Sequence, residues 1–423
     1  MTFSRATAIV VGAGPAGLMA AETLADQGFQ VDVYDAMASA GRKFLIAGRG
    51  GMNLTHSEEQ DLFCERYFER KEQIASMLAH FSSLDMRRWA EELGIATFVG
   101  TSGRVFPVDM KAAPLLRAWL QRIRSKSVQF HMRHRWLNWR DDSLVFQHDG
   151  LEFERHADVV VFALGGASWP QLGSTGAWCQ PFIAQNIEVD ELKPSNCGFT
   201  VHWSAHLKER CSGHALTSVA IMYRDHAGDE QYQKGQLIIS EYGVEGSLIY
   251  AASACLRRQI HTQGFTHIHL DLLPDHSLEK IHMLIEHSQG SKSLSSHLKS
   301  KLNLDAGKLA LVYECSTAEQ RSNSLELATI LKRLPLRLDA TRPIAEAISS
   351  AGGVRFETMD AGLMLKNKPG HFCAGEMLDW EAPTGGYLLT ACMAMGKHVG
   401  LSAANWLKNV HAVDANANTD VEQ

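Results

Sequence analysis

Apolar and polar residues follow two different periods at the start of the chain. Residues 8–11 (AIVV) form a short apolar run with turn residues directly after it, which predicts a buried β-strand. Residues 12–17 read GAGPAG, residues 18–27 have helical spacing, and residues 31–34 form a second short strand that ends at Asp35. The order is therefore strand, Gly-x-Gly-x-x-Gly, helix, strand and a terminal acidic residue.

This order predicts a site for a dinucleotide. Gly12 permits the tight turn out of the strand, Gly14 lets the backbone approach a pyrophosphate, and Gly17 lets the helix pack closely on the sheet. The helix N-terminus offers N–H groups and its positive dipole end to the phosphates. The carboxylate of Asp35, about twenty residues beyond the start of the motif, can accept the ribose hydroxyls. The motif alone does not distinguish FAD from NAD.

The stretch after the second strand is rich in glycine and positive charge. Residues 41–55 hold four glycines and three cations, which suits a loop wrapped around an anion. A solvated basic loop is the alternative.

The remaining pattern mixes helices with two kinds of strand. The spacing of apolar residues predicts helices over residues 58–93, 112–124, 342–350 and 388–406. Alternating residues predict a three-stranded antiparallel meander over residues 128–140, 143–147 and 151–155. Residues 158–166 are an unbroken apolar run that ends in glycines, and residues 370–376 form a short buried strand that ends at Gly-Glu. Strands of this kind are typical of a parallel sheet covered by helices on both faces.

The character of the sequence changes in the middle of the chain. Residues 191–340 contain no self-similar period, so we interpret them as an inserted domain rather than a repeat. We predict that this domain is β-rich over residues 191–276 and helical over residues 277–340. The flanking residues 1–190 and 341–423 would then form one discontinuous α/β domain.

Composition narrows the classes of function. The 423 residues carry 41 Lys and Arg against 47 Asp and Glu, a net charge of -6, so attraction to nucleic acid or to a membrane is not favoured. The eight cysteines are scattered without a C-x-x-C pair, and the first strand begins within eight residues of the N-terminus. We therefore expect no disulfide framework, no signal peptide and a cytoplasmic location.

Two clusters permit more than one interpretation. His267, His269 and Asp271 alternate on one strand, which is a conceivable metal site, but an exposed strand face is the simpler interpretation and we predict no metal. Residues 131–140 mix cations with Trp136 and Trp139, as a nucleic-acid surface does, but a meander strand also needs both kinds of residue.

Several blocks together resemble one family. The fingerprint over residues 12–35 is accompanied by GRKFLIAGRGGMN (41–53), GRVFP (103–107) with Lys111, VVVFALGGASWPQLGSTG (159–176), GQLIISEYGVEG (235–246), AGGV (351–354) and GEMLDWEAPTGGY (375–387). In this order they resemble the bacterial NAD(P)/FAD-dependent oxidoreductases of the glutathione-reductase-like superfamily, also called aminoacetone-oxidase-family flavoproteins. A bile-acid-operon reductase belongs to the same group.

The resemblance implies a glutathione-reductase-type, FAD-binding Rossmann domain with a β-meander and an inserted domain. It implies that the residues which bind FAD are Gly12, Ala13, Gly14, Pro15, Ala16, Gly17, Asp35, Ala36, Arg42, Lys43, Gly51, Asn53, Trp136, Gly165, Gly166, Gly375, Glu376, Gly385, Gly386 and Tyr387. Within this set, Glu376 would contact the ribityl or pyrophosphate region. Gly385, Gly386 and Tyr387 would direct a helix N-terminus at the isoalloxazine ring.

Two positions depart from the family pattern. Met52 stands where many relatives have cysteine, so no thiol is expected beside the flavin, and Leu388 replaces a usual polar residue. No general acid can be identified, and Arg104, Lys111 and Tyr387 are the candidates.

The resemblance implies an FAD-dependent oxidoreductase that passes electrons from a donor to a small-molecule acceptor that is unsaturated or carbonyl-like, or to oxygen. There is no second Gly-x-Gly-x-x-Gly, so NAD(P)H, if used, must dock transiently on the flavin. The alternative is a flavin-bound RNA-binding or RNA-modifying protein with a basic face around Arg133, Arg135 and Arg140.

Overall fold

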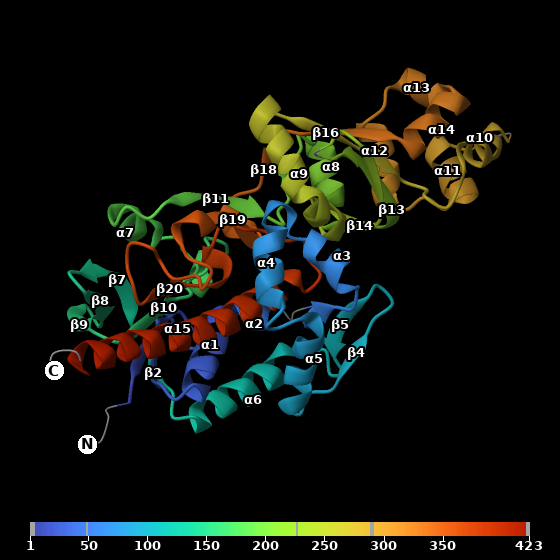
Figure 1. The fold of residues 1–423 in the computed structure, drawn as a ribbon. Coiled ribbons are helices and arrows are strands. Elements are labelled where there is room, and N and C mark those ends of the chain that lie inside the picture. Colours follow the sequence, from blue (N-terminus) through green and yellow to red (C-terminus); the bar gives the residue numbers. More distant parts are fainter. Residues whose placement is uncertain (1–4, 48–49, 226, 288–291, 420–423) are drawn as a thin grey trace. The chain divides into compact units, whose positions relative to one another are not determined.

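The computed structural model describes residues 5–47, 50–225, 227–287 and 292–419. The chain divides into two compact units (Figure 1). One unit extends to Lys193 and resumes at Ser349, and the other comprises Pro194–Ile348.

The first unit is built on a five-stranded parallel sheet in the order β20-β10-β1-β2-β6. Its strands are β1 (Thr7–Val11), β2 (Gln30–Asp35), β6 (Gln129–Met132), β10 (Val159–Phe162) and β20 (His371–Cys373). All four residues of β10 are buried, as expected of a strand covered on both faces. The helices α1 (Pro15–Asp26) and α15 (Tyr387–Thr419) pack along each other and on this sheet (Figure 1). The predicted α/β class with a Rossmann-type sheet is confirmed.

The first predicted meander strand is divided between two sheets. Its beginning, β6, joins the edge of the parallel sheet, and only β7 (Arg135–Arg140) pairs with β8 (Ser143–His148) and β9 (Leu151–Arg155). Arg133 has a φ of +63°, and its N–H donates to the carbonyl of Met37 at 2.9 Å. This turn redirects the chain, so the single strand predicted over residues 128–140 was wrong.

Short elements connect β2 to β6. They are α2 (Arg42–Ala47), β3 (Thr55–His56), α3 (Gln60–Glu65), η1 (Phe68–Arg70), α4 (Lys71–Leu78), α5 (Ser83–Glu92), β4 (Thr97–Val99), β5 (Arg104–Pro107) and α6 (Ala112–Ser125). A reciprocal capping box between Ser82 and Asp85 begins α5. The strands form a small antiparallel sheet in the order β3-β5-β4.

The segment that returns to the first unit differs from the helix predicted over residues 342–350. Only a 3₁₀ turn, η3 (Ile344–Glu346), forms there, and β19 (Ser349–Val354) then pairs with β11 (Val189–Ser195). Gly352 and Gly353 have positive φ, and a Cβ at Gly352 would overlap the carbonyl oxygen of Glu191. The close approach of this backbone favours a strand that a sequence period could not reveal. The other elements of this unit are η2 (Pro170–Leu172), α7 (Cys179–Ala184), η4 (Phe356–Thr358) and η5 (Gly375–Met377).

The second unit contains a seven-stranded antiparallel sheet in the order β17-β16-β13-β14-β15-β12-β18. Its strands are β12 (Phe199–Thr200), β13 (His214–Arg224), β14 (Glu230–Ser240), β15 (Gly243–Glu245), β16 (Thr266–Asp271), β17 (Leu334–Leu338) and β18 (Ala340–Thr341). Its helices are α8 (Ala205–Cys211), α9 (Ser247–Gln263), α10 (Leu278–Glu286), α11 (Leu294–Leu302), α12 (Ala306–Glu314), α13 (Ala318–Ser322) and α14 (Ser324–Lys332). The helix α9 therefore lies in the stretch predicted to be β-rich, and β17 lies in the stretch predicted to be helical.

Within the described ranges, no helix has the length and apolar character needed to span a bilayer.

Asp271 on β16 is buried and accepts hydrogen bonds from Lys332 at 2.6 Å and Tyr232 at 3.0 Å. Its carboxylate is therefore already engaged with protein donors beside the two histidines of that strand.

Candidate functional site

The glycines of the turn between β1 and α1 differ in role: some are needed for packing, and one is available for ligand binding. Gly12 has a φ of +107°, and a Cβ there would overlap the carbonyl oxygen of Ala163. A Cβ at Gly17 would overlap the carbonyl oxygen of Gly12, whereas a Cβ at Gly14 would meet no atom within 4 Å. The fold itself therefore requires Gly12 and Gly17. Gly14, at the N-cap of α1, borders open space in which a pyrophosphate can approach the helix N-terminus.

Asp35, the last residue of β2, holds this turn through its carboxylate. Oδ2 accepts the backbone N–H of Ala13 at 2.7 Å, and Oδ1 accepts that of Met37 at 2.7 Å, on the far side of Ala36. Burial raises the pKa of Asp35, while the two backbone N–H groups and the Arg42 guanidinium oppose the rise. Each carboxylate oxygen keeps a further lone pair, so the group can accept ribose hydroxyls as well.

An ion pair between α2 and η5 links two of the predicted cofactor residues. Lys43 Nζ lies 2.7 Å from Glu376 Oε2, and both side chains are mostly buried. The Lys43 amine also donates to Ser168 Oγ at 2.8 Å and lies 3.4 Å from Ser174 Oγ. The other oxygen of Glu376 accepts the N–H of Ser350 at 3.0 Å. Four segments that are distant in sequence therefore meet in one polar cluster.

Three further predicted glycines pack around this cluster. Gly165 has a φ of +70°, and a Cβ at the next residue, Gly166, would overlap the hydroxyl of Ser350. Gly375 has a φ of +85°, and a Cβ there would lie 2.7 Å from Cβ of Ala16, in the first turn of α1. The polar cluster therefore adjoins the helix N-terminus beside Pro15 and Gly14.

A second group of predicted residues surrounds β3. Among the described residues, the buried Oδ1 of Asn53 has no hydrogen-bond partner, although buried acceptors are almost always paired. Gly51 has a φ of +110°, and a Cβ there would overlap the methyl carbon of Met110. An absent group that carries an N–H donor would satisfy Asn53, which fits the polar edge of an isoalloxazine ring. Gly48 and Arg49 of the same loop lie outside the described residues.

The start of α15 packs against β3. Gly385 and Gly386 have φ values of +136° and +93°, and a Cβ at Gly386 would overlap the backbone of Thr55. Thr390 Oγ1 hydrogen-bonds both Thr55 Oγ1 and the carbonyl of Gly386 at 2.9 Å. The N-terminus of this long helix is thereby fixed beside Asn53, where its positive dipole end favours negative charge.

Tyr387 is a packing and positioning residue. Its side chain is 5% exposed, its carbonyl accepts the hydroxyl of Tyr67 at 3.0 Å, and its phenol hydrogen-bonds Glu58. Burial and the Glu58 carboxylate raise the pKa of Tyr387, so the phenol keeps its proton. Burial by itself would raise the pKa of Glu58, but hydrogen bonds from Arg66 and Tyr387 lower it below its ordinary value.

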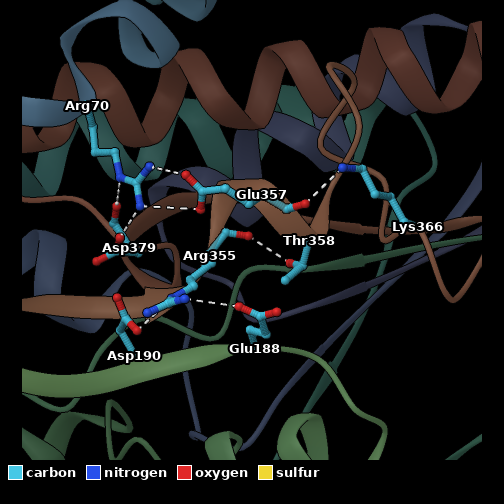
Figure 2. Close-up of polar contacts among 8 residues, drawn as sticks. All are labelled: Arg70, Glu188, Asp190, Arg355, Glu357, Thr358, Lys366 and Asp379. Atoms are coloured by element: carbon cyan, nitrogen blue, oxygen red, sulfur yellow. Dashed lines mark hydrogen bonds and ion pairs between the residues drawn. The ribbon is translucent and has the colours of Figure 1, made fainter.

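Arg70 anchors the segment that carries Glu376, Gly385 and Gly386. Its Nε donates to the carbonyl of Asp379 at 3.1 Å, its guanidinium pairs with the Asp379 carboxylate, and its Nη1 lies 2.6 Å from Glu357 Oε1 (Figure 2). These contacts join η1 to the GEMLDW segment.

A separate ion-pair group lies beside it. Arg355 bonds Asp190 at 2.7 Å and Glu188 at 3.0 Å, and Thr358 Oγ1 donates to the Arg355 carbonyl at 2.7 Å (Figure 2). Lys366 donates to the carbonyl of Glu357 at 2.8 Å. Among the described residues, the Arg355 guanidinium pairs with Glu188 and Asp190 rather than with residues 375–387, which distinguishes it from Arg70.

Three predicted residues are not assembled with these clusters. Trp136 is 7% exposed, and its indole packs against Phe162 and Phe182, so only its backbone is available to an adenine ring. Lys111 is exposed at the N-cap of α6, and Arg104 is half-buried on β5.

Sequence reasoning missed the residues that hold the charged ones in place. Ser168, Ser174 and Ser350 bond Lys43 and Glu376, and Arg70 fixes Asp379. Ser168 and Ser174 lie inside a recognised block, and Ser350 directly precedes AGGV, so their position was a usable signal. Nothing in the pattern around Arg70 marks it.

The family described as "HI0933-like protein Rossmann domain" matches residues 6–402. A 3-dehydro-bile acid delta(4,6)-reductase from Clostridium scindens is 24% identical over an alignment of 418 residues that covers 93% of this chain and 98% of that protein. A ribosomal RNA dihydrouridine synthase from Escherichia coli is 25% identical over an alignment of 398 residues that covers 90% of this chain and 94% of that protein.

Solved structures share the fold at lower identity. A flavocytochrome c3 fumarate reductase aligns with a TM-score of 0.51 at 15% identity, over 96% of this chain and 79% of that chain. A 3-ketosteroid delta1-dehydrogenase from Sterolibacterium denitrificans aligns with a TM-score of 0.52 at 12% identity, over 94% and 99%.

Proposed function

The chain belongs to the HI0933-like Rossmann-domain family and is an FAD-dependent oxidoreductase, and we propose on this premise that it moves hydride from NADH or NADPH to a conjugated carbonyl acceptor. The acceptor would contain a carbon–carbon double bond conjugated to a carbonyl group. Hydride adds to the β-carbon of such a group, and a proton completes the reduction at the α-carbon.

The names of two relatives support this acceptor class. One is named for reduction of a 3-dehydro-bile acid at delta(4,6), and the other for production of dihydrouridine in ribosomal RNA. In both names the reduced bond is a ring carbon–carbon double bond conjugated to a carbonyl. The common chemistry is a better guide to this chain than either substrate, because both relatives are only about a quarter identical to it.

The observation that carries the cofactor assignment is the open space at Gly14 together with the unpartnered Asn53 oxygen. Gly14 and the N-terminus of α1 would hold the pyrophosphate, and Asp35 would hold the ribose. Asn53 and the N-terminus of α15 would face the isoalloxazine ring. Bound FAD supplies the two-electron hydride carrier, which no amino-acid side chain provides.

The protein residues must also manage one proton. Tyr387 is buried and bonded to Glu58, so we assign it to positioning rather than to proton donation. Arg104 and Lys111 remain the candidates named from the sequence. The acceptor itself is a small molecule in this proposal, and the donor docks transiently because the sequence holds no second dinucleotide fingerprint.

Anaerobic stopped-flow reduction with NADH and NADPH, followed by mixing with acceptors, tests the proposal. We expect flavin bleaching by one of the nucleotides and faster reoxidation by cyclohex-2-enone than by fumarate or oxygen. Reduced flavin that reacts only with oxygen would refute the acceptor class. Absence of bleaching by both nucleotides would refute the donor.

An RNA-modifying role is the second candidate, since this chain aligns with 94% of the Escherichia coli ribosomal RNA dihydrouridine synthase. The basic face predicted for this role is partly neutralised, because Arg140 pairs with Glu154 at 2.7 Å and with Glu152 at 3.4 Å. Salt-dependent binding of ribosomal RNA and formation of dihydrouridine in an unmodified ribosomal RNA transcript would favour this candidate.

We also propose a cytoplasmic location. None of the eight cysteines forms a disulfide within the described residues, as a reducing compartment allows.

A further inference from the structure

An apolar surface adjoins the loop that carries Gly51 and Asn53. It consists of Phe98 on β4, Phe106 on β5 and Met110, and we call these three side chains the apolar platform. The rings of Phe98 and Phe106 are 5.8 Å apart, as cross-strand partners. Phe106 and Met110 both border the space at Gly51, since a Cβ there would lie 3.7 Å from the Phe106 ring and overlap Met110. The platform therefore reaches the predicted flavin-binding loop without a break.

The backbone of Met110 is held in an unusual conformation. Its φ is +61°, in the left-handed region that residues with a side chain rarely adopt. The Met110 carbonyl accepts the N–H of Met52 at 3.0 Å, and the Met110 N–H donates to the Pro107 carbonyl at 2.9 Å. Such conformations persist where the surrounding structure fixes them, and they are concentrated at functional sites. Here the conformation places the Met110 side chain over Gly51.

The platform is exposed although it is apolar. Phe98 is 40% exposed and Met110 is 37% exposed. Val99, the neighbour of Phe98, is 44% exposed but pairs with Val105, so strand alternation places it on the opposite face of the hairpin. Contiguous exposed apolar surface in a water-soluble unit commonly marks a binding site.

The platform and Asn53 form one continuous structure. The N–H of Leu54 donates to the Val105 carbonyl at 2.9 Å, which fixes the loop on the same strand that carries Phe106. A molecule lying on the platform would therefore extend toward the unpartnered Asn53 oxygen and the predicted position of the flavin. None of the three platform side chains can form a strong hydrogen bond, so the surface suits hydrocarbon rather than a ribose or a dicarboxylate.

We propose that the apolar platform is the subsite for the hydrocarbon body of the acceptor, which selects conjugated ketones with an extended hydrocarbon body over small or polar ones. The inference rests on the proposed reduction of conjugated carbonyl compounds. It adds the size and polarity of the substrate, which that proposal leaves open.

The test uses the FAD-loaded protein, with 4-androstene-3,17-dione as the polycyclic probe and cyclohex-2-enone as the small one. Binding to the oxidised enzyme is followed by the perturbation of flavin absorbance, and turnover is followed by flavin reoxidation. Phe98→Ser should raise the Kd and KM of the steroid about tenfold or more, because it removes a large apolar contact. The KM of cyclohex-2-enone should stay within about twofold. Val99→Ser is the matched control, and Met110→Gln is the second variant on the platform.

Equal steroid affinity in Phe98→Ser, Met110→Gln and the parent protein would overturn the inference, as would an equal loss in Val99→Ser. Sedimentation could also show that the parent protein is a dimer and that Phe98→Ser is a monomer. If the KM of the steroid is then unchanged, the platform is a contact between two copies of the chain and the inference is overturned. Steroid that binds in a platform-dependent way but is not reduced would refute the proposed function and leave the subsite. Reduction of cyclohex-2-enone without steroid binding would do the reverse.

Discussion

The amine of Lys43 and the carboxylate of Glu376 form a 2.7 Å ion pair across 333 residues of sequence. The sequence resemblance assigns both residues to FAD, but in the structure they first bind each other. Because the pair is neutral, the positive charge of Lys43 is balanced before any phosphate arrives. Both residues also bond serine hydroxyls or backbone, so the pair is a fixed part of the site rather than two mobile charges.

Replacing only one partner of this pair should destabilise the protein more than replacing both partners. Lys43→Met leaves a mostly buried carboxylate without its partner, and we expect a loss of about 1–3 kcal/mol in the free energy of unfolding and weaker FAD binding. The Lys43→Met/Glu376→Gln double variant should be closer to the parent than the sum of the single variants predicts. Urea denaturation and FAD titration measure both quantities. Lys71→Met, which breaks the exposed pair with Glu65, is the control and should have no measurable effect. Additive single effects would show that the two residues act independently.

Two glycines of one motif should respond differently to a methyl group. Gly14→Ala should leave the melting temperature of the FAD-free protein unchanged but weaken FAD binding about tenfold or more, since its Cβ enters only the open space. Gly17→Ala should destabilise the FAD-free protein itself, because its Cβ overlaps the Gly12 carbonyl. Differential scanning fluorimetry with and without FAD compares them. Unchanged FAD affinity in Gly14→Ala would place the pyrophosphate elsewhere.

Asp35 should contribute to the fold as well as to FAD binding. Asp35→Asn turns an amide donor toward one of two buried backbone N–H groups, so we expect a loss of about 1–3 kcal/mol in the FAD-free protein and weaker FAD binding. Burial raises the folded-state pKa of Asp35. Its contribution to stability is therefore complete below the ordinary carboxyl pKa and is lost as the pH rises through the raised value.

Stability measured from pH 3 upward should accordingly show the parent losing stability relative to Asp35→Asn as the pH increases toward neutrality. Ribose hydroxyls stabilise the ionised form, so FAD affinity should increase over the same range. A parallel pH dependence of the two proteins would show that the Asp35 carboxylate is not perturbed.

Arg70 should affect the cofactor more than its neighbour Arg355 does. Arg70→Lys keeps the charge but loses the hydrogen bonds to the Asp379 carbonyl and to Glu357, so FAD affinity should fall about fivefold or more. The visible absorbance of the bound flavin should also shift, because the segment bearing Gly385 and Gly386 moves. Arg355→Lys is the matched control and should leave the flavin spectrum unchanged. Identical spectra in both variants would reduce Arg70 to a structural role.

Electrons should leave the flavin without a disulfide relay. Met52 replaces the family cysteine, and Cys392, a thiol beside the polar cluster, has a pKa that burial and the Glu376 carboxylate raise to about 12. Such a thiol stays protonated at neutral pH and reacts slowly. Alkylation should therefore leave flavin reduction and reoxidation intact, and anaerobic titration should consume two electrons per FAD. A four-electron endpoint would reveal a redox-active cysteine pair.

The amino-acid sequence by itself determined the local parts of the site. Gly12, Gly14, Gly17 and Asp35 were predicted in their turn and at their strand end because tight turns and helix N-termini depend on neighbours within a few residues. The all-apolar strand β10 identified the parallel sheet for the same reason. The sequence also excluded a family-type thiol, since Met52 has no sulfhydryl group.

Only the tertiary structure decided which distant residues meet. Residues 342–350 have a local pattern that favours a helix, but β19 forms because its glycines allow close pairing with β11. Residues 128–140 alternate as one strand, but the turn at Arg133 gives β6 to the parallel sheet. Lys43 finds Glu376, Arg70 finds Asp379, and Met110 reaches Gly51, because side-chain packing and charge pairing act through space. A hydrophobic period reports which face of an element is buried, but it does not contain the identity of the partner.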